Sequence, residues 1–270
     1  MVITSFSNPR IKAIRKLEQK KYRQESGLFF VEGLRTVGEA IQTNAQIESL
    51  VIAPDLLISD FGLSILDNPG LADVERLEIS VEIFEKIAQK QGPQGIGAVV
   101  HQNWQPLSEI IVGSEDIWVA LESVADPGNL GTIMRTADGI GARGIILLGQ
   151  STDPYDPAAV KASMGAIFSL VIAQADWKIF HAWQRNQNLT LTGTSDRAET
   201  DYKAVHYTRP LVLLMGSERH GLPDEMLEAC DHVVSIPMQG RSDSLNLAVA
   251  TGIMLYEIYD QTRNLDIIES

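Results

Sequence analysis

The sequence of 270 residues predicts an α/β protein whose C-terminal half is built on a parallel sheet. From residue 117 onward, almost continuous apolar runs alternate with segments in which apolar residues recur at helical spacing. Such runs are typical of parallel strands that helices cover on both faces. A similar alternation over residues 1–100 predicts a smaller α/β domain, and we interpret residues 101–116 as a linker to the second domain, residues 117–270.

The first domain is expected to open with a basic helix. The further elements expected in order are a strand at 27–33, a helix at 34–44, a strand at 47–54, a helix at 80–90 and a strand at 95–102. Ser80 is a suitable N-cap for the last of these helices, because its hydroxyl can accept a bond from the first turn.

The second domain contains six apolar runs that we interpret as strands. They lie at 117–122, 144–149, 169–173, 189–193, 210–216 and 231–237. Ligands of such sheets bind outside the C-terminal strand ends. The residues that follow the first, fifth and sixth runs are therefore the candidates for a functional site.

The glycines at 139, 141 and 144 have the G-x-G-x-x-G spacing of dinucleotide-binding oxidoreductases. That site needs a strand before the glycines and a helix after them. Here a helical stripe precedes the glycines and an apolar run follows them. We therefore expect them to end a helix and enter a strand.

The composition limits the class of protein. Hydrophobic residues make up 44% and charged residues 21% of the chain, an ordinary balance for a globular protein. No apolar run approaches the ~20 residues that span a membrane, and no secretory signal is visible. The single cysteine, Cys230, excludes an internal disulfide and favours a reducing compartment, the cytoplasm; its side chain is expected to be a small core residue.

The net charge of −13 speaks against general nucleic-acid binding, but the charge is unevenly distributed. Residues 10–23 contain one acidic residue and seven basic ones: Arg10, Lys12, Arg15, Lys16, Lys20, Lys21 and Arg23. This segment can contact phosphates. It also fits a solvated helix face, because Ile11, Ile14 and Leu17 form an apolar stripe. Both interpretations stay open at this point.

The residues after the first run carry a candidate site. Asp126 followed by Pro127 predicts an N-cap and the first helical residue, which places Asn129 in the first turn. Arg135 lies about 9 Å further along the helix axis, and its side chain tilts back toward the helix start. Arg135 can therefore reach a group held near Asn129, although a structural ion pair with Asp126 or Glu122 is the alternative.

Two further candidate loops follow the fifth and sixth runs. Gly216 and Gly221 flank Glu218 and would allow a ligand close to backbone donors, unless this is an ordinary turn. Residues 236–240 form an apolar loop with a proline, suited to lining a pocket for a flat ring. Ser244 is the expected N-cap of the helix that follows.

In this order, the three segments resemble the SpoU family of RNA ribose methyltransferases, within the knotted α/β methyltransferase superfamily. The first family motif is matched by Asn129, Gly131, Arg135, Thr136 and Ala137. The second, Gly-x-Glu-x-x-Gly-Leu, is matched by Gly216, Glu218, Gly221 and Leu222. The third is matched by Ile236, Pro237, Met238, Gly240, Ser244, Leu245 and Asn246, with Leu247 and Ala248 in place of the more usual Val-Ser. The first domain also looks like the substrate-binding domain that often precedes this one.

The resemblance implies an α/β parallel sheet with a C-terminal trefoil knot, a SPOUT methyltransferase domain, and a homodimer formed through helices of that domain. It implies S-adenosylmethionine as the cofactor, with no metal ion and no membrane partner. The cofactor-binding residues it implies are Thr194, Gly216, Glu218, Gly221, Ile236, Met238, Ser244, Leu245 and Asn246. The catalytic residues it implies are Asn129, Arg135 and Glu218.

The implied reaction is methylation of a ribose 2′-hydroxyl in RNA, with 23S-type ribosomal RNA as the expected substrate. An RNA substrate favours phosphate contacts by the seven basic residues of 10–23, and Arg35 is added to this RNA-binding set. The counterpart of Arg135 is the proposed base in the family, but a guanidinium resists deprotonation, so a substrate phosphate held by Arg135 is an easier proton acceptor. A tRNA methyltransferase of the same family and a non-catalytic RNA-binding or assembly factor are the alternatives.

Overall fold

The structure is a computed structural model that describes residues 2–88, 92–241 and 243–263. Its contacts divide the chain into two units. Unit 1 consists of Met1–Asn103 and Asp153–Ser169, and unit 2 consists of Trp104–Thr152 and Leu170–Ser270. The segment 153–169 thus belongs to the first unit by its contacts, although it lies inside the range 117–270 in the chain.

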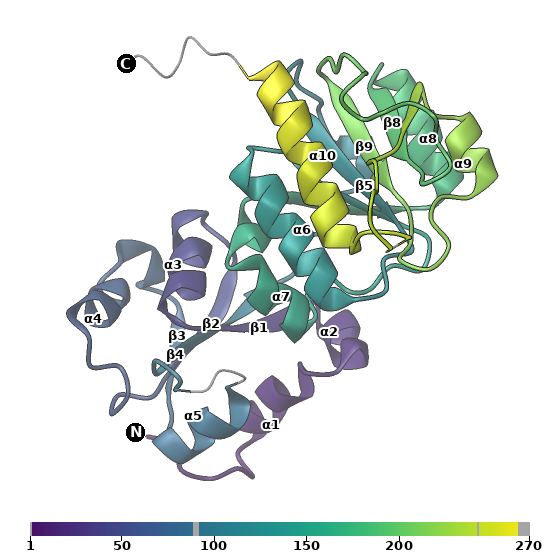
Figure 1. The fold of residues 1–270 in the computed structure, drawn as a ribbon. Helices are drawn as coiled ribbons and strands as arrows, with labels where there is room; N and C mark the ends of the chain where they lie inside the picture. Colours follow the sequence, from purple (N-terminus) through teal and green to yellow (C-terminus); the bar gives the residue numbers. More distant parts are fainter. Residues whose placement is uncertain (1, 89–91, 242, 264–270) are drawn as a thin grey trace. The chain divides into compact units, whose positions relative to one another are not determined.

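Unit 1 is built on a four-stranded mixed sheet with the order β1-β4-β2-β3 (Figure 1). Its strands are β1 (Leu28–Glu32), β2 (Ile47–Ile52), β3 (Glu75–Glu78) and β4 (Ile96–His101). β4 is antiparallel to both β1 and β2, whereas β2 and β3 are parallel. The sequence did not predict β3, because it is a short edge strand in which Leu77 alone is buried.

Helices cover both faces of this sheet. They are α1 (Pro9–Lys16), α2 (Lys20–Ser26), α3 (Leu34–Gln42), α4 (Asp60–Leu66), α5 (Val81–Ile87) and α7 (Pro157–Ser163), with the 3-10 turns η1 (Pro69–Leu71) and η3 (Ala166–Phe168). The N-cap predicted at Ser80 is confirmed, since its side chain accepts a bond from the Ile83 amide. That helix ends at Ile87, and residues 89 and 90 of the expected range lie outside the described residues.

The expected basic helix over 10–23 is two helices, which corrects the prediction. The carbonyls of Leu17 and Glu18 accept bonds from the Arg23 guanidinium, and so they do not continue the helical pattern. The apolar stripe is confirmed: Ile11, Ile14 and Leu17 are at most 6% exposed and pack in one cluster with the sheet and α5.

Unit 2 contains a six-stranded parallel sheet, as the sequence predicted, with the order β10-β8-β9-β5-β6-β7. Its strands are β5 (Ile117–Glu122), β6 (Gly144–Leu148), β7 (Val171–Ala175), β8 (Thr190–Thr194), β9 (Leu211–Met215) and β10 (His232–Val234). Its helices are α6 (Pro127–Gly139), α8 (Trp177–Asn186), α9 (Asp224–Glu228) and α10 (Leu247–Thr262), with the 3-10 turn η2 (Leu107–Glu109).

The two faces of this sheet are covered by different helices. Trp118 and Ile146 pack with Phe180 of α8 and Met226 of α9 in one buried cluster. On the other face α6 and α10 lie side by side (Figure 1). Within the described ranges, no helix has the length and apolar character needed to cross a bilayer.

The glycine-rich stretch joins α6 to β6, as expected. Gly139 is the last residue of α6, Gly141 has a φ of 73°, and Gly144 begins β6. A Cβ on Gly144 would collide with the Val171 carbonyl and lie 2.7 Å from the Trp118 ring. These glycines therefore serve chain reversal and close packing, which excludes a dinucleotide site here.

Cys230 is half-buried and packs against the cluster under α8 and α9, as expected of a core residue. Burial, followed by the negative charge of Asp231, raises the pKa of its thiol to about 12. The thiol therefore stays protonated at neutral pH, which argues against a nucleophilic role.

Candidate active site

Three loops of unit 2 meet at the C-terminal ends of their strands. They follow β5 (residues 123–126), β9 (residues 216–222) and β10 (residues 235–246). Because β5, β9, β8 and β10 are successive parallel neighbours in the sheet, the loops that follow β5, β9 and β10 leave it at one edge. Side chains from all three loops or the helices that follow them are joined by hydrogen bonds.

The first contribution comes from the start of α6. Asp126 is the N-cap, as predicted, and its side chain accepts a bond from the Asn129 amide at 2.8 Å. Pro127 occupies the first helical position. This cap places the Asn129 side chain in the first turn, where its Nδ2 donates to Oε1 of Glu218 at 3.1 Å.

Glu218 receives three hydrogen bonds from the β5 loop and α6. Besides Asn129, the amides of Ala125 and Asp126 donate to its carboxylate at 3.2 and 3.3 Å. Partial burial raises the pKa of Glu218, but the bonds from Asn129 and the backbone outweigh burial, so the net shift is downward. Glu218 is therefore an ionised acceptor at neutral pH and is poorly suited to act as a base.

The Ala125 and Asp126 amides were not among the sequence candidates. The N-cap pattern at Asp126 is the signal that could have identified them, because a helix start presents unpaired amides. Ser123, just before them, has a φ of 51°, and its hydroxyl donates to Glu122 at 2.6 Å. This left-handed residue turns the chain from β5 toward α6.

The third contribution comes from Asn246, whose Nδ2 donates to Oδ1 of Asn129 at 3.0 Å. Its own Oδ1 accepts bonds from the amides of Ala248 and Val249. Asn246, and not Ser244 as predicted, is thus the N-cap of α10. The physical reason is that one amide side chain caps the helix with its oxygen and bonds Asn129 with its nitrogen.

The β9 loop is a tight turn that presents Glu218. Ser217 and Gly221 exchange backbone hydrogen bonds at 3.0 and 3.2 Å. A Cβ on Gly216 would collide with the backbone of Gly221 and Leu222, and Gly221 has a φ of 64°. Both glycines are therefore required by the turn itself.

The β10 loop has exposed apolar atoms and unpaired backbone groups, the properties expected of a loop that lines a pocket for a flat ring. Within the described part of the chain, the backbone groups of residues 236–241 make no hydrogen bond. Met238 is 40% exposed, although it is apolar. Thr194, at the end of β8, donates its hydroxyl to the Met215 sulfur at 3.4 Å. Unpaired backbone groups beside exposed apolar atoms suit a flat ring with a polar edge.

Arg135 is exposed on α6 and makes no ion pair with any described residue. The alternative of a structural pair with Asp126 or Glu122 is therefore wrong. Ser244 and Leu245 lie in the β10 loop, but no hydrogen bond within the described ranges links them to Asn129 or Glu218.

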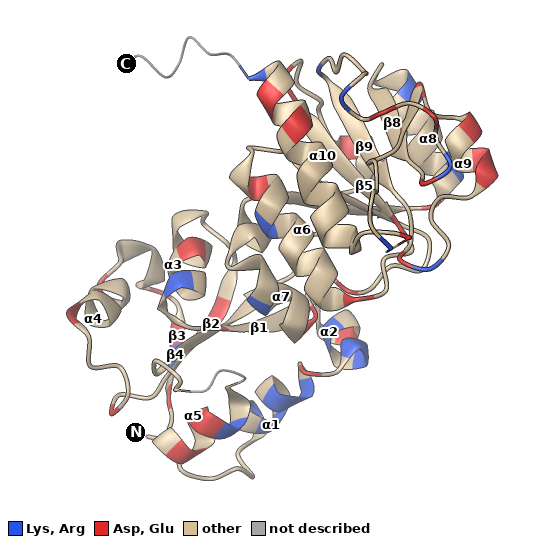
Figure 2. Ribbon diagram, viewed as in Figure 1, with Lys and Arg blue, Asp and Glu red and all other residues tan. Residues whose placement is uncertain are grey.

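Most of the basic residues proposed for RNA binding are solvent-exposed. Figure 2 marks Lys and Arg in blue on α1, α2 and α3 of unit 1. Arg10 pairs with Glu75 at 3.0 Å and Lys21 with Glu25 at 3.8 Å. Of the residues proposed for RNA binding, the exposed cations without an ion pair to a described residue are Lys12, Arg15, Lys16, Lys20 and Arg35.

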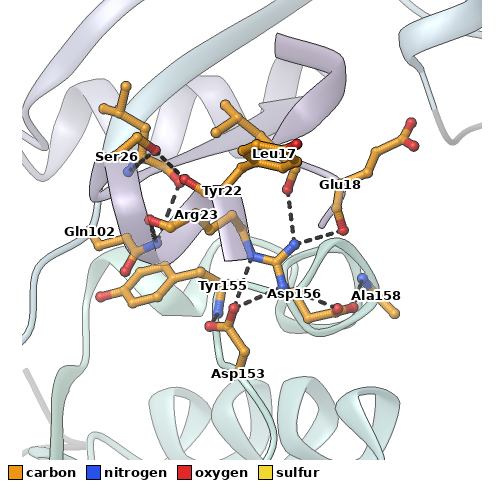
Figure 3. A network of polar contacts seen from close by, with 11 residues as sticks. Leu17, Glu18, Tyr22, Arg23, Ser26, Gln102, Asp153, Tyr155, Asp156 and Ala158 are labelled. Atoms are coloured by element: carbon orange, nitrogen blue, oxygen red, sulfur yellow. Dashed lines mark hydrogen bonds and ion pairs between the residues drawn. The ribbon is translucent and has the colours of Figure 1, made fainter. Parts of the chain in front are cut away.

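Arg23 is the exception and corrects the sequence prediction. Its side chain is 1% exposed and bonded to Asp153 at 2.8 Å and Asp156 at 3.3 Å (Figure 3). The carbonyls of Leu17 and Glu18 accept its remaining bonds. Arg23 therefore cannot contact RNA, because its donors are already used inside unit 1.

Two protein families match this chain. The SpoU rRNA Methylase family matches residues 116–256, and the MRM3-like substrate binding domain matches residues 8–98. The crystal structure of an AdoMet-bound rRNA methyltransferase from Sinorhizobium meliloti is 39% identical, with a TM-score of 0.88 over 96% of this chain and 97% of that chain.

Two relatives of known name extend the comparison. The 23S rRNA (uridine(2479)-2′-O)-methyltransferase of Streptomyces viridochromogenes is 30% identical over 91% of this chain and 87% of its own length. The 23S rRNA (guanosine-2′-O-)-methyltransferase RlmB of Haemophilus ducreyi is 33% identical over 78% of this chain and 93% of its own length. With its parallel α/β sheet and its three joined loops, this chain belongs to the SpoU rRNA methylase family.

Proposed function

We propose that this chain transfers the methyl group of S-adenosylmethionine to a ribose 2′-hydroxyl of 23S-type ribosomal RNA. The observation that carries the proposal is the hydrogen-bonded series Glu218–Asn129–Asn246, which ties together the three loops that hold the family motifs. The named relatives are 23S rRNA 2′-O-methyltransferases, and this supports the same substrate class here.

The residues present fit S-adenosylmethionine. The adenine ring would lie against the apolar β10 loop, with the backbone of Ile236 and Met238 reading its edge. Thr194, Gly216, Gly221, Ser244 and Leu245 complete the cofactor-binding set. When bound, the cofactor supplies the methyl group as an electrophile.

Arg135 is proposed to hold an RNA phosphate beside the target ribose. It is exposed, and its guanidinium forms no ion pair with an acidic side chain in the described ranges. The 2′-hydroxyl gives its proton to a phosphate oxygen held by Arg135, because a guanidinium itself resists deprotonation. Asn129 orients the ribose, and holding the reactants in line can supply about 7–11 kcal/mol of the barrier reduction. Ionised Glu218 fixes Asn129.

Residues 1–100 are proposed to bind the RNA, with 101–116 as the linker and 117–270 as the catalytic domain. The exposed cations on α1, α2 and α3 support this division, since phosphate contacts come from such side chains. The acidic remainder of the chain limits non-specific binding. A ribosomal RNA substrate implies the cytoplasm.

Two architectural features belong to the same proposal. Val249 and Tyr256 of α10 are 51% and 56% exposed, and such an apolar helix face supports a homodimer through this domain. Tyr256→Asp should give monomers in sedimentation velocity if the dimer uses the α10 face.

A trefoil knot is supported by the path of residues 234–235, whose backbone groups bond to those of Ser195, Thr200 and Tyr202 before the chain reaches α10.

The function is tested by methyl transfer from radiolabelled S-adenosylmethionine to purified RNA. We expect label in ribosomal RNA, recovered as 2′-O-methylribose, with none in tRNA. S-adenosylhomocysteine should raise the melting temperature and NADH should not. Label in tRNA alone would reassign the substrate, and methyl transfer to neither RNA would overturn the proposal.

A further inference from the structure

A recess of about 290 Å³ lies in unit 1, between α1, α2 and the sheet. Its floor is apolar and comes from three strands: Leu28 of β1, Leu77 of β3 and Val99 of β4. Leu77 and Val99 are 8% and 5% exposed, and both belong to the lining of the recess. An apolar floor of this size accepts a flat ring system.

The rim combines an aromatic ring with two cations. Tyr22 of α2 is half-buried, and the Lys16 ammonium lies over its ring, 4.9 Å from the centroid. Lys16 and Arg10 both line the recess from α1. Aromatic rings next to cations bind single-stranded nucleic acid by stacking the bases while holding the backbone.

β2 adds hydrogen-bonding groups. The register shift between Ile47 and Ser49 interrupts the pairing with β4. Consecutive residues of a regular strand point to opposite faces, but beside this shift both Glu48 and Ser49 line the recess. Ser49 is 4% exposed as a residue, and its hydroxyl makes no hydrogen bond to any described residue. Its Oγ retains accessible surface, so this hydroxyl is free to bond a ligand or water in the recess.

We propose that this recess binds one unpaired nucleotide of the RNA substrate, an assignment that rests on the proposed function. The base stacks on Tyr22 above the apolar floor, and Lys16 and Arg10 hold its phosphate. Oε2 of Glu48 lies 3.0 Å from Nε2 of His101, which leaves its other carboxylate oxygen for a ligand. That oxygen and the hydroxyl of Ser49 accept bonds from base amino groups, so bases with an exocyclic amine are preferred over uracil. An acidic peptide fits less well, because it offers no base to stack on Tyr22 above the apolar floor.

The recess is held in shape by Arg23, which directly follows Tyr22. The guanidinium of Arg23 is buried among Asp153, Asp156 and two carbonyls, while its own carbonyl accepts a bond from Gln102 (Figure 3). The side chain and the backbone of Arg23 are therefore both held in place. Tyr22 is consequently positioned before RNA arrives, which lowers the ordering cost of binding.

The test uses the full chain and three fluorescein-labelled RNAs: hexacytidylate, hexauridylate and a 12-base-pair duplex. Tyr22→Leu should weaken hexacytidylate binding about fivefold or more, since the stacking surface is lost. Tyr22→Phe, the matched control, should bind within about twofold of the wild type. Neither variant should alter duplex binding, which depends on phosphate contacts alone.

The cations supply a second matched pair. Lys16→Gln should weaken hexacytidylate binding more than Lys12→Gln, because Lys12 is exposed on α1 but does not line the recess. Equal effects of the two lysine variants, or unchanged binding by Tyr22→Leu, would overturn the nucleotide site. Displacement of hexacytidylate by hexaglutamate at equal concentration would also overturn it, in favour of a peptide surface.

Methyl transfer to ribosomal RNA is measured on the same preparations. A wild type that methylates RNA while Tyr22→Leu changes neither oligonucleotide binding nor KM refutes the recess and leaves the function standing. A wild type that transfers no methyl group but binds hexacytidylate through Tyr22 refutes the function and leaves the recess standing.

Discussion

Asn246 donates a hydrogen bond from Nδ2 to Oδ1 of Asn129, 3.0 Å away. Asn129 in turn donates from its own Nδ2 to Glu218, which as an ionised carboxylate only accepts. The two contacts determine which way the Asn129 amide faces, because a flipped amide would lose both bonds. The loops after β5, β9 and β10 are thereby joined by one ordered series of donors and acceptors.

Asn246→Asp should separate the capping role of Asn246 from its bond to Asn129. Aspartate keeps the acceptor for Ala248 and Val249, so the melting temperature should change little. It loses the donor toward Asn129, so methyl transfer should fall at least about tenfold. Asn246→Ala should lose the same activity and about 1 kcal/mol of stability as well. Full activity of the aspartate variant in the methyl-transfer assay would show that the amide contact is dispensable.

Arg135→Ala should abolish methyl transfer while stability and cofactor binding persist. Arg135 is exposed and makes no ion pair within the described chain, so its loss should cost less than about 0.5 kcal/mol. Binding of S-adenosylhomocysteine is measured by calorimetry and turnover by label in RNA. Arg143→Ala, another exposed arginine of unit 2, is the control and should remain active. An active Arg135→Ala enzyme would show that Arg135 is not part of the active site.

Arg23→Met should destabilise the protein by about 3–5 kcal/mol, because it leaves the buried Asp153 carboxylate without its partner. Arg10→Ala breaks an exposed pair with Glu75 and should cost only about 0–1 kcal/mol. Urea unfolding of both variants measures the contrast. Equal losses would mean that burial of the Arg23 pair has no energetic consequence.

The downward pKa shift of Glu218 predicts a specific pH dependence of stability. A carboxylate whose pKa is lower in the folded state stabilises the fold above its unfolded pKa of about 4.3, and this contribution disappears as pH falls through the folded pKa. The melting temperature of Glu218→Gln should therefore lie below that of the wild type at pH 7. The two should converge in acid, once the pH lies below the lowered folded-state pKa of Glu218. A difference that grows in acid would contradict the hydrogen-bonded carboxylate.

The sequence by itself determined the parts of the fold that depend on local patterning. Six apolar runs predicted the six parallel strands, because strands buried on both faces need apolar residues at every position. Asp126 and Pro127 predicted the start of α6, since the cap and the proline act within one turn. The motifs containing Asn129, Glu218 and Asn246 were identified by their resemblance to those of the SpoU family.

The tertiary structure alone decided the features that depend on distant partners. Arg23 belongs to a basic segment by its sequence, yet Asp153 and Asp156, 130 and 133 residues away, take it out of solvent. Asn246 caps α10 with the oxygen of the same amide whose nitrogen donates to Asn129, 117 residues away in the chain. β3 forms because β2 offers an unpaired edge to a segment with one buried side chain. A local pattern records what a residue prefers, and only the folded chain determines which partner it meets.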